Sequence, residues 1–202
     1  MTSTERIVAL TQAIEYVQRA GIPGAIVECG VWRGGSMMAV ARTLLAESNT
    51  DRDLYLFDTF EGMSAPTDAD RDHQGASAAK LLESSSRDKD EVWCYAGIDD
   101  VRANLESTGY PTARLHFVKG PVEDTIPDQA PEEIALLRLD TDWYESTKHE
   151  LAHLYPRLKP GGVLIIDDYG HWQGARKAVD EYFEGNVLLQ RIDYTGRLAI
   201  KR

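Results

Sequence analysis

Two short apolar segments of the chain end in paired carboxylates. Residues 136–142 read LLRLDTD and residues 163–168 read VLIIDD. Runs of Leu, Ile and Val of this length are typical of strands that are buried on both faces. The carboxyl ends of parallel strands meet at one edge of a sheet, where open α/β folds bind their ligands. We therefore expect one sheet edge to carry four acidic side chains: Asp140, Asp142, Asp167 and Asp168.

Carboxylates that are crowded in this way repel one another unless a cation lies among them or one of them keeps its proton. The first hypothesis is therefore a divalent metal at a catalytic edge of the sheet. Ligands that are all oxygen favour Mg²⁺, Ca²⁺ or Mn²⁺ over zinc. The alternative is that each aspartate only caps a helix or forms a turn. Two acidic strand ends in one domain favour a shared role.

A glycine-rich segment near the N-terminus predicts a ligand-binding turn. Residues 25–36, AIVECGVWRGGS, run from a short apolar strand through a turn into a helical pattern. Gly30 permits a tight turn and the close approach of a ligand, while Gly34 and Gly35 leave backbone amides open at the helix start. This order suits a nucleotide or nucleoside, although the spacing differs from the dinucleotide fingerprint and no P-loop lysine follows. A plain strand-to-helix turn is the alternative.

The next predicted strand, residues 53–58, also ends in an acidic residue. Asp58 lies at the distance beyond the glycine turn at which dinucleotide-binding folds place the acid that holds ribose. A carboxylate can accept hydrogen bonds from both hydroxyls of a ribose. Asp58 is therefore predicted to bind the sugar of a nucleoside, and a turn residue is the alternative.

Residues 59–89 form the longest irregular stretch of the chain, rich in Ser, Asp, Gly and Pro. Loops of this length in a compact domain are usually lids or binding loops. The alternation of Asp68, Asp70 and Asp72 resembles a calcium loop, but the glycine and the closing glutamate of that loop are missing. We expect a mobile loop that closes over the substrate.

The remaining patterns alternate between strands and helices. An amphipathic helix is expected within residues 1–20, before the break at 21–24. Further helices are expected at 98–108, 145–158 and 175–183, a strand at 114–118, and a terminal hairpin from 187–190 and 198–200. This order predicts a single α/β domain over residues 1–202, with a parallel sheet, helices on both faces and an antiparallel hairpin at the end.

The composition narrows the possible partners. The chain has 202 residues, 43% hydrophobic and 27% charged, with a formal net charge of −11. That charge argues against nucleic acid or an anionic membrane surface as a partner, since both need clustered Lys and Arg. The two cysteines, Cys29 and Cys94, are too few for a disulfide framework and lack metal-ligand spacing. With neither a signal-peptide pattern nor a membrane-spanning run, a cytoplasmic location is expected.

Four segments together resemble a known family: residues 27–36, 56–62, 139–147 and 166–169. They are similar to the TylF/MycF-type O-methyltransferases, the macrocin and novobiocin-pathway sugar methyltransferases. The resemblance runs from about residue 21 to about residue 183. It implies a Rossmann-like class I methyltransferase that uses S-adenosylmethionine, with a mostly parallel seven-stranded sheet whose last strand is antiparallel. It also implies that Mg²⁺ binds the acceptor hydroxyl, and that the acceptor is a small molecule, often a sugar on an antibiotic scaffold.

The resemblance also implies the site residues. Glu28, Gly30 and Ser36 would line the methionine end of the cofactor, Asp58 would hold the ribose, and the loop 120–123 would lie near the adenine. The predicted cofactor contacts are Glu28, Cys29, Gly30, Gly34, Ser36, Asp58, Thr59, Gly120, Glu123 and Asp140. The predicted metal ligands are Asp140, Asp167 and Asp168.

The reaction needs a base, because an alkyl hydroxyl is a poor nucleophile while it is protonated. Asp140 is the first candidate, as ligand and base together, and Asp142 is the second. His149 and His171 are weaker candidates, and His149 is better explained as a solvated helix residue.

Better-known members of the family carry a longer N-terminal segment over the active site, whereas one short helix precedes the first strand here. We therefore expect the acceptor pocket to be more open, or closed by residues 59–89 or by a partner subunit in a homo-oligomer. Two other functions stay open: a catechol-type O-methyltransferase that acts on phenolic diols, and a nucleoside- or metal-binding module without turnover. The loop spacing disfavours an NAD-dependent oxidoreductase.

Overall fold

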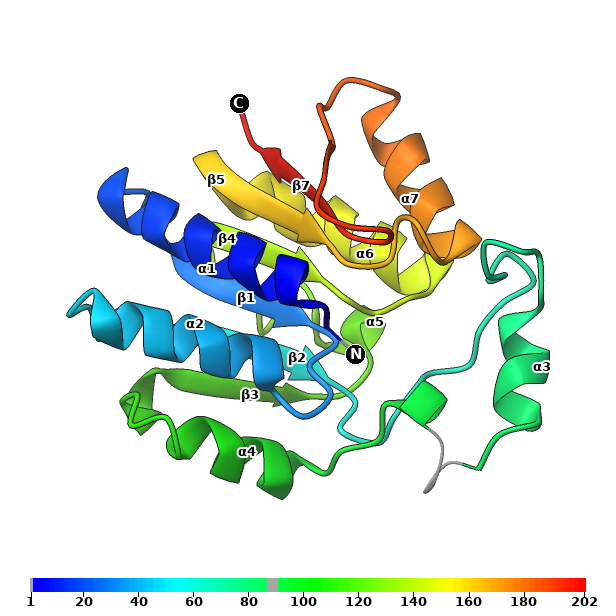
Figure 1. Ribbon diagram of the computed structural model, residues 1–202, viewed down its shortest axis with the longest axis horizontal. Coiled ribbons are helices and arrows are strands. Elements are labelled where there is room, and N and C mark those ends of the chain that lie inside the picture. The colour runs from blue at the N-terminus through cyan, green and yellow to red at the C-terminus, as the bar shows by residue number, and fades with distance from the viewer. Residues whose placement is uncertain (1, 87–90) are drawn as a thin grey trace.

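A computed structural model of the protein describes residues 2–86 and 91–202, and its centre is a seven-stranded sheet (Figure 1). The strand order is β3-β2-β1-β4-β5-β7-β6. The strands are β1 Ala25–Cys29, β2 Leu54–Asp58, β3 Leu115–Lys119, β4 Ile134–Leu139, β5 Leu158–Ile166, β6 Gln190–Arg191 and β7 Arg197–Ile200. Neighbours from β3 to β5 pair in parallel, and β7 pairs antiparallel with both β5 and β6. The predicted fold class is confirmed.

Helices cover both faces of the sheet (Figure 1). One face carries α1 Thr4–Arg19, α2 Gly35–Ala46 and α4 Ile98–Glu106. The other face carries α5 Val122–Thr125, α6 Tyr144–Leu154 and α7 Gln173–Phe183. Because the connections between β1 and β5 each return the chain to a parallel strand, the carboxyl ends of these five strands all lie at one edge.

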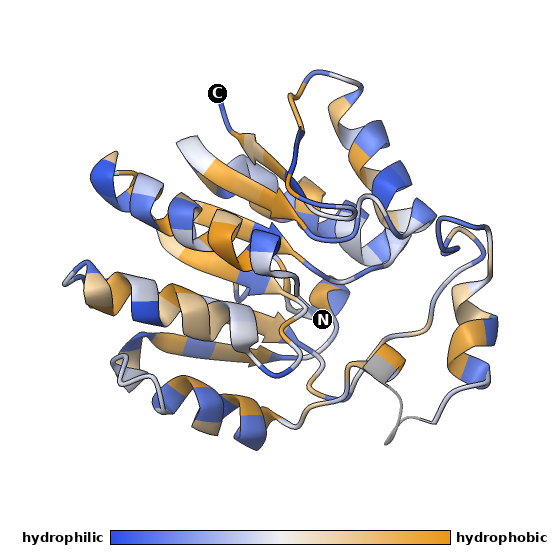
Figure 2. Cartoon of the chain, in the orientation of Figure 1, coloured by the Kyte–Doolittle hydropathy of each residue, from blue (hydrophilic) through white to orange (hydrophobic). Residues whose placement is uncertain are grey.

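The strands are apolar on both sides, as the sequence pattern predicts. All five residues of β1 and all six of β4 are buried. Successive side chains point to opposite faces, so Ile26 joins the core under α1 and α2 while Val27 joins the core under α6 and α7. Figure 2 shows this as mostly apolar central strands beneath helices that alternate apolar and polar residues.

The segment after β2 packs over the carboxyl edge of the sheet and contains α3 Ala78–Glu83. The buried carboxylate of Asp70 accepts hydrogen bonds from the backbone N–H of Thr67 (2.6 Å) and of Tyr144 at the start of α6 (2.8 Å). Trp143 donates from Nε1 to the carbonyl of Ser64 at 3.0 Å. Thus residues 64–70 are tied to α6. The predicted mobility of the loop 59–89 stays a prediction, and its residues 87–89 lie outside the described part of the chain.

A small third core holds this segment in place. It is formed by Ala78 and Leu82 of α3 with Trp143, Trp172 and Ala175. The rings of Trp143 and Trp172 meet edge to face, with 5.0 Å between their centroids.

Among the described residues, no helix is both long enough and apolar enough to span a bilayer.

Candidate active site

A cleft of about 510 Å³ opens at the carboxyl edge of the sheet. Its walls come from the glycine turn after β1, the end of β2, the loop after β3 and the acidic ends of β4 and β5. Met63 and Ser64 of the packed segment close one side, and Thr2 and Arg6 at the start of α1 lie at another. The cleft therefore lies where the sequence predicted a ligand.

Gly30 brings the end of β1 against the end of β4. Its φ is +79°, and a Cβ at this position would lie 2.0 Å from the carbonyl oxygen of Asp140. The backbone N–H of Asp140 donates to the carbonyl of Cys29 at 2.8 Å. Only glycine fits both the dihedral and the space, so this turn fixes Asp140 beside the glycine loop.

Asp58 holds the glycine loop as well as lining the cleft. Its Oδ2 accepts from the backbone N–H of Val31 at 2.6 Å and of Trp32 at 3.0 Å, and its Oδ1 accepts from Phe60 N–H at 2.6 Å. Burial raises the pKa of Asp58, and these three N–H donors oppose the rise. The sequence predicted a ribose contact at Asp58 but missed this loop-anchoring role.

The predicted cofactor residues divide into two groups. Those that line the cleft are Gly30, Asp58, Thr59, Gly120, Glu123 and Asp140. Glu28, Cys29, Gly34 and Ser36 lie outside the lining formed by the described residues. Glu28 and Cys29 are buried inside β1, and Ser36 is buried in the first turn of α2. A Cβ on Gly34 would lie 2.6 Å from the side chain of Leu105, so this glycine serves the packing of α2 on α4.

Three carboxylates converge at the ends of β4 and β5. One oxygen from each of Asp140, Asp142 and Asp168 lies within 4.8 Å of the other two. Burial raises the pKa of Asp142 to about 7, and burial together with the negative charge of Asp142 raises that of Asp168 well above its usual value. The Oδ2 atom of Asp168 is buried and has no hydrogen-bond partner among the described residues. An oxygen donor set with an orphaned buried atom fits a divalent cation.

The carboxylate of Asp167, a predicted metal ligand, is held by two guanidinium groups, and its role as a ligand stays a prediction. Its Oδ1 pairs with Arg138 at 2.5 Å, and its Oδ2 pairs with Arg6. The structure thus places Asp142, rather than Asp167, beside Asp140 and Asp168. Consecutive residues at a strand end point to opposite sides, so Asp167 and Asp168 face different neighbours.

Arg138 is the main residue of this edge that the sequence patterns did not predict. It is buried in β4 and pairs with Glu28, with Asp140 at 2.6 Å and with Asp167. Arg6 of α1 adds a second cation, which also pairs with Asp193 at 3.1 Å. The one signal in the sequence was a charged residue inside an otherwise apolar strand.

The two histidine candidates lie in different places. His149 directs Nε2 at the carbonyl of Ile126 at 2.9 Å and packs against His153, outside the lining of the cleft that the described residues form. His171 lines the cleft, with Nδ1 3.0 Å from the hydroxyl of Tyr194. Burial lowers the pKa of His171. His149 is therefore a half-buried helix residue outside the cleft rather than a solvated one, and the identity of the base stays a prediction.

The family model described as TylF, macrocin-O-methyltransferase, matches residues 1–199. The chain belongs to the TylF family. The resemblance seen in the sequence is confirmed at the level of the family, whose description is that of an O-methyltransferase.

Two curated relatives of the chain are named as O-methyltransferases. The chain is 36% identical over 90% of its length to the 8-demethyl-8-(2,3-dimethoxy-alpha-L-rhamnosyl)-tetracenomycin-C 4'-O-methyltransferase of Streptomyces olivaceus, and spans 66% of that protein. It is 35% identical to the mycinamicin III 3''-O-methyltransferase of Micromonospora griseorubida, over 95% of this chain and 73% of the relative. Thus it spans about two thirds to three quarters of the length of these relatives.

A solved structure of a TylF-type enzyme superimposes closely. The O-methyltransferase NovP matches with a TM-score of 0.84 and 30% identity, over 98% of this chain and 79% of the other. The calicheamicin methyltransferase CalS11, at 19% identity and a TM-score of 0.73, shares the fold. These matches confirm the Rossmann-like class I methyltransferase architecture.

Proposed function

We propose that this TylF-family protein transfers the methyl group of S-adenosylmethionine to a hydroxyl of a sugar carried by a natural product, in a reaction that requires Mg²⁺. The observation that carries the metal requirement is the convergence of the carboxylates of Asp140, Asp142 and Asp168, together with a buried Oδ2 of Asp168 that has no hydrogen-bond partner among the described residues. The sugar acceptor is supported by two relatives whose names specify O-methylation of a glycosylated tetracenomycin and of mycinamicin III.

The lining of the cleft divides between cofactor and acceptor. Asp58, Thr59 and the loop 120–123 would hold the nucleoside, and Gly30 with Asp140 would hold the methionine end. The acceptor would then lie beyond the acidic group, towards His171 and Trp172. Such positioning of two reactants supplies much of the rate enhancement when the reacting atoms are aligned.

Asp140 and Asp168 would hold the cation, with Asp142 beside them. A bound divalent cation would lower the pKa of a hydroxyl group attached to it. Asp142 is the preferred acceptor for the hydroxyl proton, because Asp140 is tied to Arg138 at 2.6 Å. Asp140 is second in this role, and Asp167 could serve as a ligand only if Arg6 released its Oδ2.

Mass spectrometry tests this function directly. An aryl rhamnoside and a catechol are each incubated with the protein and S-adenosylmethionine, with Mg²⁺ and with excess chelator. We expect the rhamnoside to gain one methyl group with Mg²⁺ and none with chelator. Methylation should return when Mg²⁺ is added in excess of the chelator. Full activity in chelator would remove the metal requirement, and methylation of the catechol alone would favour the catechol-type alternative.

The homo-oligomer and the cytoplasmic location stay predictions.

Asp58→Ala is expected to weaken binding of S-adenosylhomocysteine by roughly tenfold or more. The substitution removes the predicted ribose contact and also the acceptor of the N–H groups of Val31 and Trp32. Calorimetry measures the dissociation constant, with Asp51→Ala, an exposed position before β2, as control. An unchanged constant in the Asp58 variant would show that the ribose lies elsewhere.

A further inference from the structure

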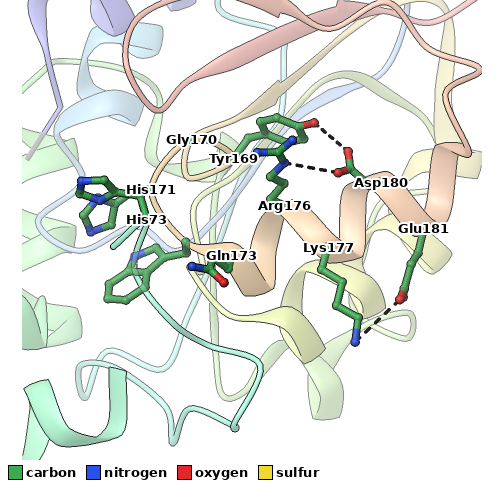
Figure 3. A pocket seen from close by; sticks show the side chains of 10 residues that line it. His73, Tyr169, Gly170, His171, Gln173, Arg176, Lys177, Asp180 and Glu181 are labelled. Atoms are coloured by element: carbon green, nitrogen blue, oxygen red, sulfur yellow. Dashed lines mark hydrogen bonds and ion pairs between the residues drawn. The ribbon is translucent and has the colours of Figure 1, made fainter. Parts of the chain in front are cut away.

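A second hollow, of about 630 Å³, lies next to the cleft at the start of α7. Figure 3 shows its walls: His73 from the packed segment, Tyr169 and His171 from the turn after β5, and the outer side chains of α7. His171 and Trp172 line the hollow on one side and the cleft on the other. The two spaces therefore share a wall.

The order of the strands places the hollow at the acceptor end of the cleft. Asp58 ends β2, the acidic group ends β4 and β5, and His171 follows β5, so these features lie in that order along the sheet edge. A path from the proposed nucleoside end past the acids leads to the shared wall. A single drug-sized ligand fills roughly 300–1,000 Å³. The cleft of about 510 Å³ lies within the range for one such ligand, so a cofactor and a whole glycoside would not fit in it together.

The walls of the hollow offer rings and balanced charges. The rings of His73 and His171 lie 5.3 Å apart, and the guanidinium of Arg176 lies 5.4 Å from the centre of the Tyr169 ring. The cations of α7 are matched by carboxylates one turn later: Arg176 pairs with Asp180 at 3.4 Å and Lys177 with Glu181 at 3.8 Å. Figure 3 shows both pairs along the outer side of the helix.

We propose that this hollow is the subsite for the rest of the glycoside, and that it takes an uncharged aromatic aglycone while the sugar lies in the cleft. The proposal rests on the proposed function. Flat rings can stack on His73 and His171, and aglycone hydroxyls can bond to exposed polar groups such as Gln173. A nucleoside diphosphate sugar fits poorly, because its phosphates would meet cations that are already neutralised in a chain of net charge −11.

Acceptors that differ only in what the sugar carries test the subsite. Initial rates with Mg²⁺ are compared for 4-nitrophenyl rhamnoside, methyl rhamnoside and a nucleoside diphosphate rhamnose. We expect the KM of the aryl glycoside to be about tenfold below those of the other two. His73→Ala should raise the KM of the aryl glycoside about threefold to tenfold and leave methyl rhamnoside unchanged. His116→Ala, which removes an imidazole paired with Asp53 near the start of β2, is the matched control.

Two results would overturn the subsite while leaving the proposed function standing. One is an equal KM for aryl and methyl rhamnoside, and the other is preference for the nucleoside diphosphate sugar. If no acceptor is methylated, the proposed function fails, and calorimetry then tests the hollow alone. In the presence of S-adenosylhomocysteine, aryl glycoside binding that weakens in His73→Ala but not in His116→Ala would support the subsite. Equal binding in both variants would overturn it.

Discussion

Asp168→Asn is expected to lower kcat for methyl transfer roughly 100-fold or more, while S-adenosylhomocysteine still binds. The substitution keeps the shape of the side chain and removes one negative charge from the group of Asp140, Asp142 and Asp168. The Asp168 oxygen that lacks a hydrogen-bond partner among the described residues is the most available ligand in that group. Replacing this carboxylate by an amide should therefore abolish cation binding, while the cofactor-binding residues around Asp58 stay unchanged.

A second measurement separates a metal ligand from a merely crowded acid. If the group binds Mg²⁺, the ion should raise the Tm of the wild type and leave that of Asp168→Asn unchanged. If no cation binds, the substitution should relieve repulsion and raise the Tm without loss of activity. Asp51→Asn, an exposed position at the opposite edge of the sheet, should behave as the wild type in both experiments.

Arg138→Met is expected to cost roughly 3–5 kcal/mol in free energy of unfolding at neutral pH. Methionine can fill much of the same volume inside β4, but it leaves the carboxylates of Glu28, Asp140 and Asp167 without their buried cation. The loss arises from uncompensated charge rather than from a cavity. Urea unfolding measures it, and Arg114→Met, which breaks a half-exposed pair with Asp53, should cost less than about 1 kcal/mol.

The loss in Arg138→Met should depend on pH. Burial raises the pKa of Glu28 from 4.5 to about 7, and the charge of Arg138 opposes that rise. A carboxyl whose pKa is higher in the folded state stabilises the fold fully below its unfolded pKa, and this contribution disappears as the pH rises through the folded pKa. Without Arg138 the pKa of Glu28 rises further. The variant should therefore lie closest to the wild type near pH 5 and furthest from it near pH 8. Equal losses at both would contradict the charge explanation.

The sequence predicted the fold and the sheet edge at which the cleft lies because both follow from local patterns. Apolar runs mark buried strands, and Gly30 marks the turn that brings β1 against Asp140. The resemblance of four segments then gave the family, which the match over residues 1–199 confirms. These signals depend on neighbours in the sequence, or on motifs that keep their spacing.

The contacts that the sequence did not predict join residues far apart in the chain. Arg6 and Asp167 are separated by 161 positions, and Asp70 reaches the backbone of Tyr144 across 74. No periodicity records such pairs, because they depend on where a helix end or a loop packs after the sheet has formed. The carboxylates that converge include Asp142 instead of Asp167. This difference depends on the direction in which each side chain points at the end of its strand, which the sequence of paired aspartates does not determine.

The start of α1 is part of the mouth of the cleft, since Thr2 lines it and Ser3 donates to Asp193 at 2.7 Å in the turn that precedes β7. An affinity tag placed before Thr2 would therefore crowd the opening through which ligands enter. The antiparallel direction of β7 carries the other terminus towards the opposite edge of the sheet (Figure 1). For purification and for immobilisation on a sensor surface, a tag after Arg202 would leave that opening clear.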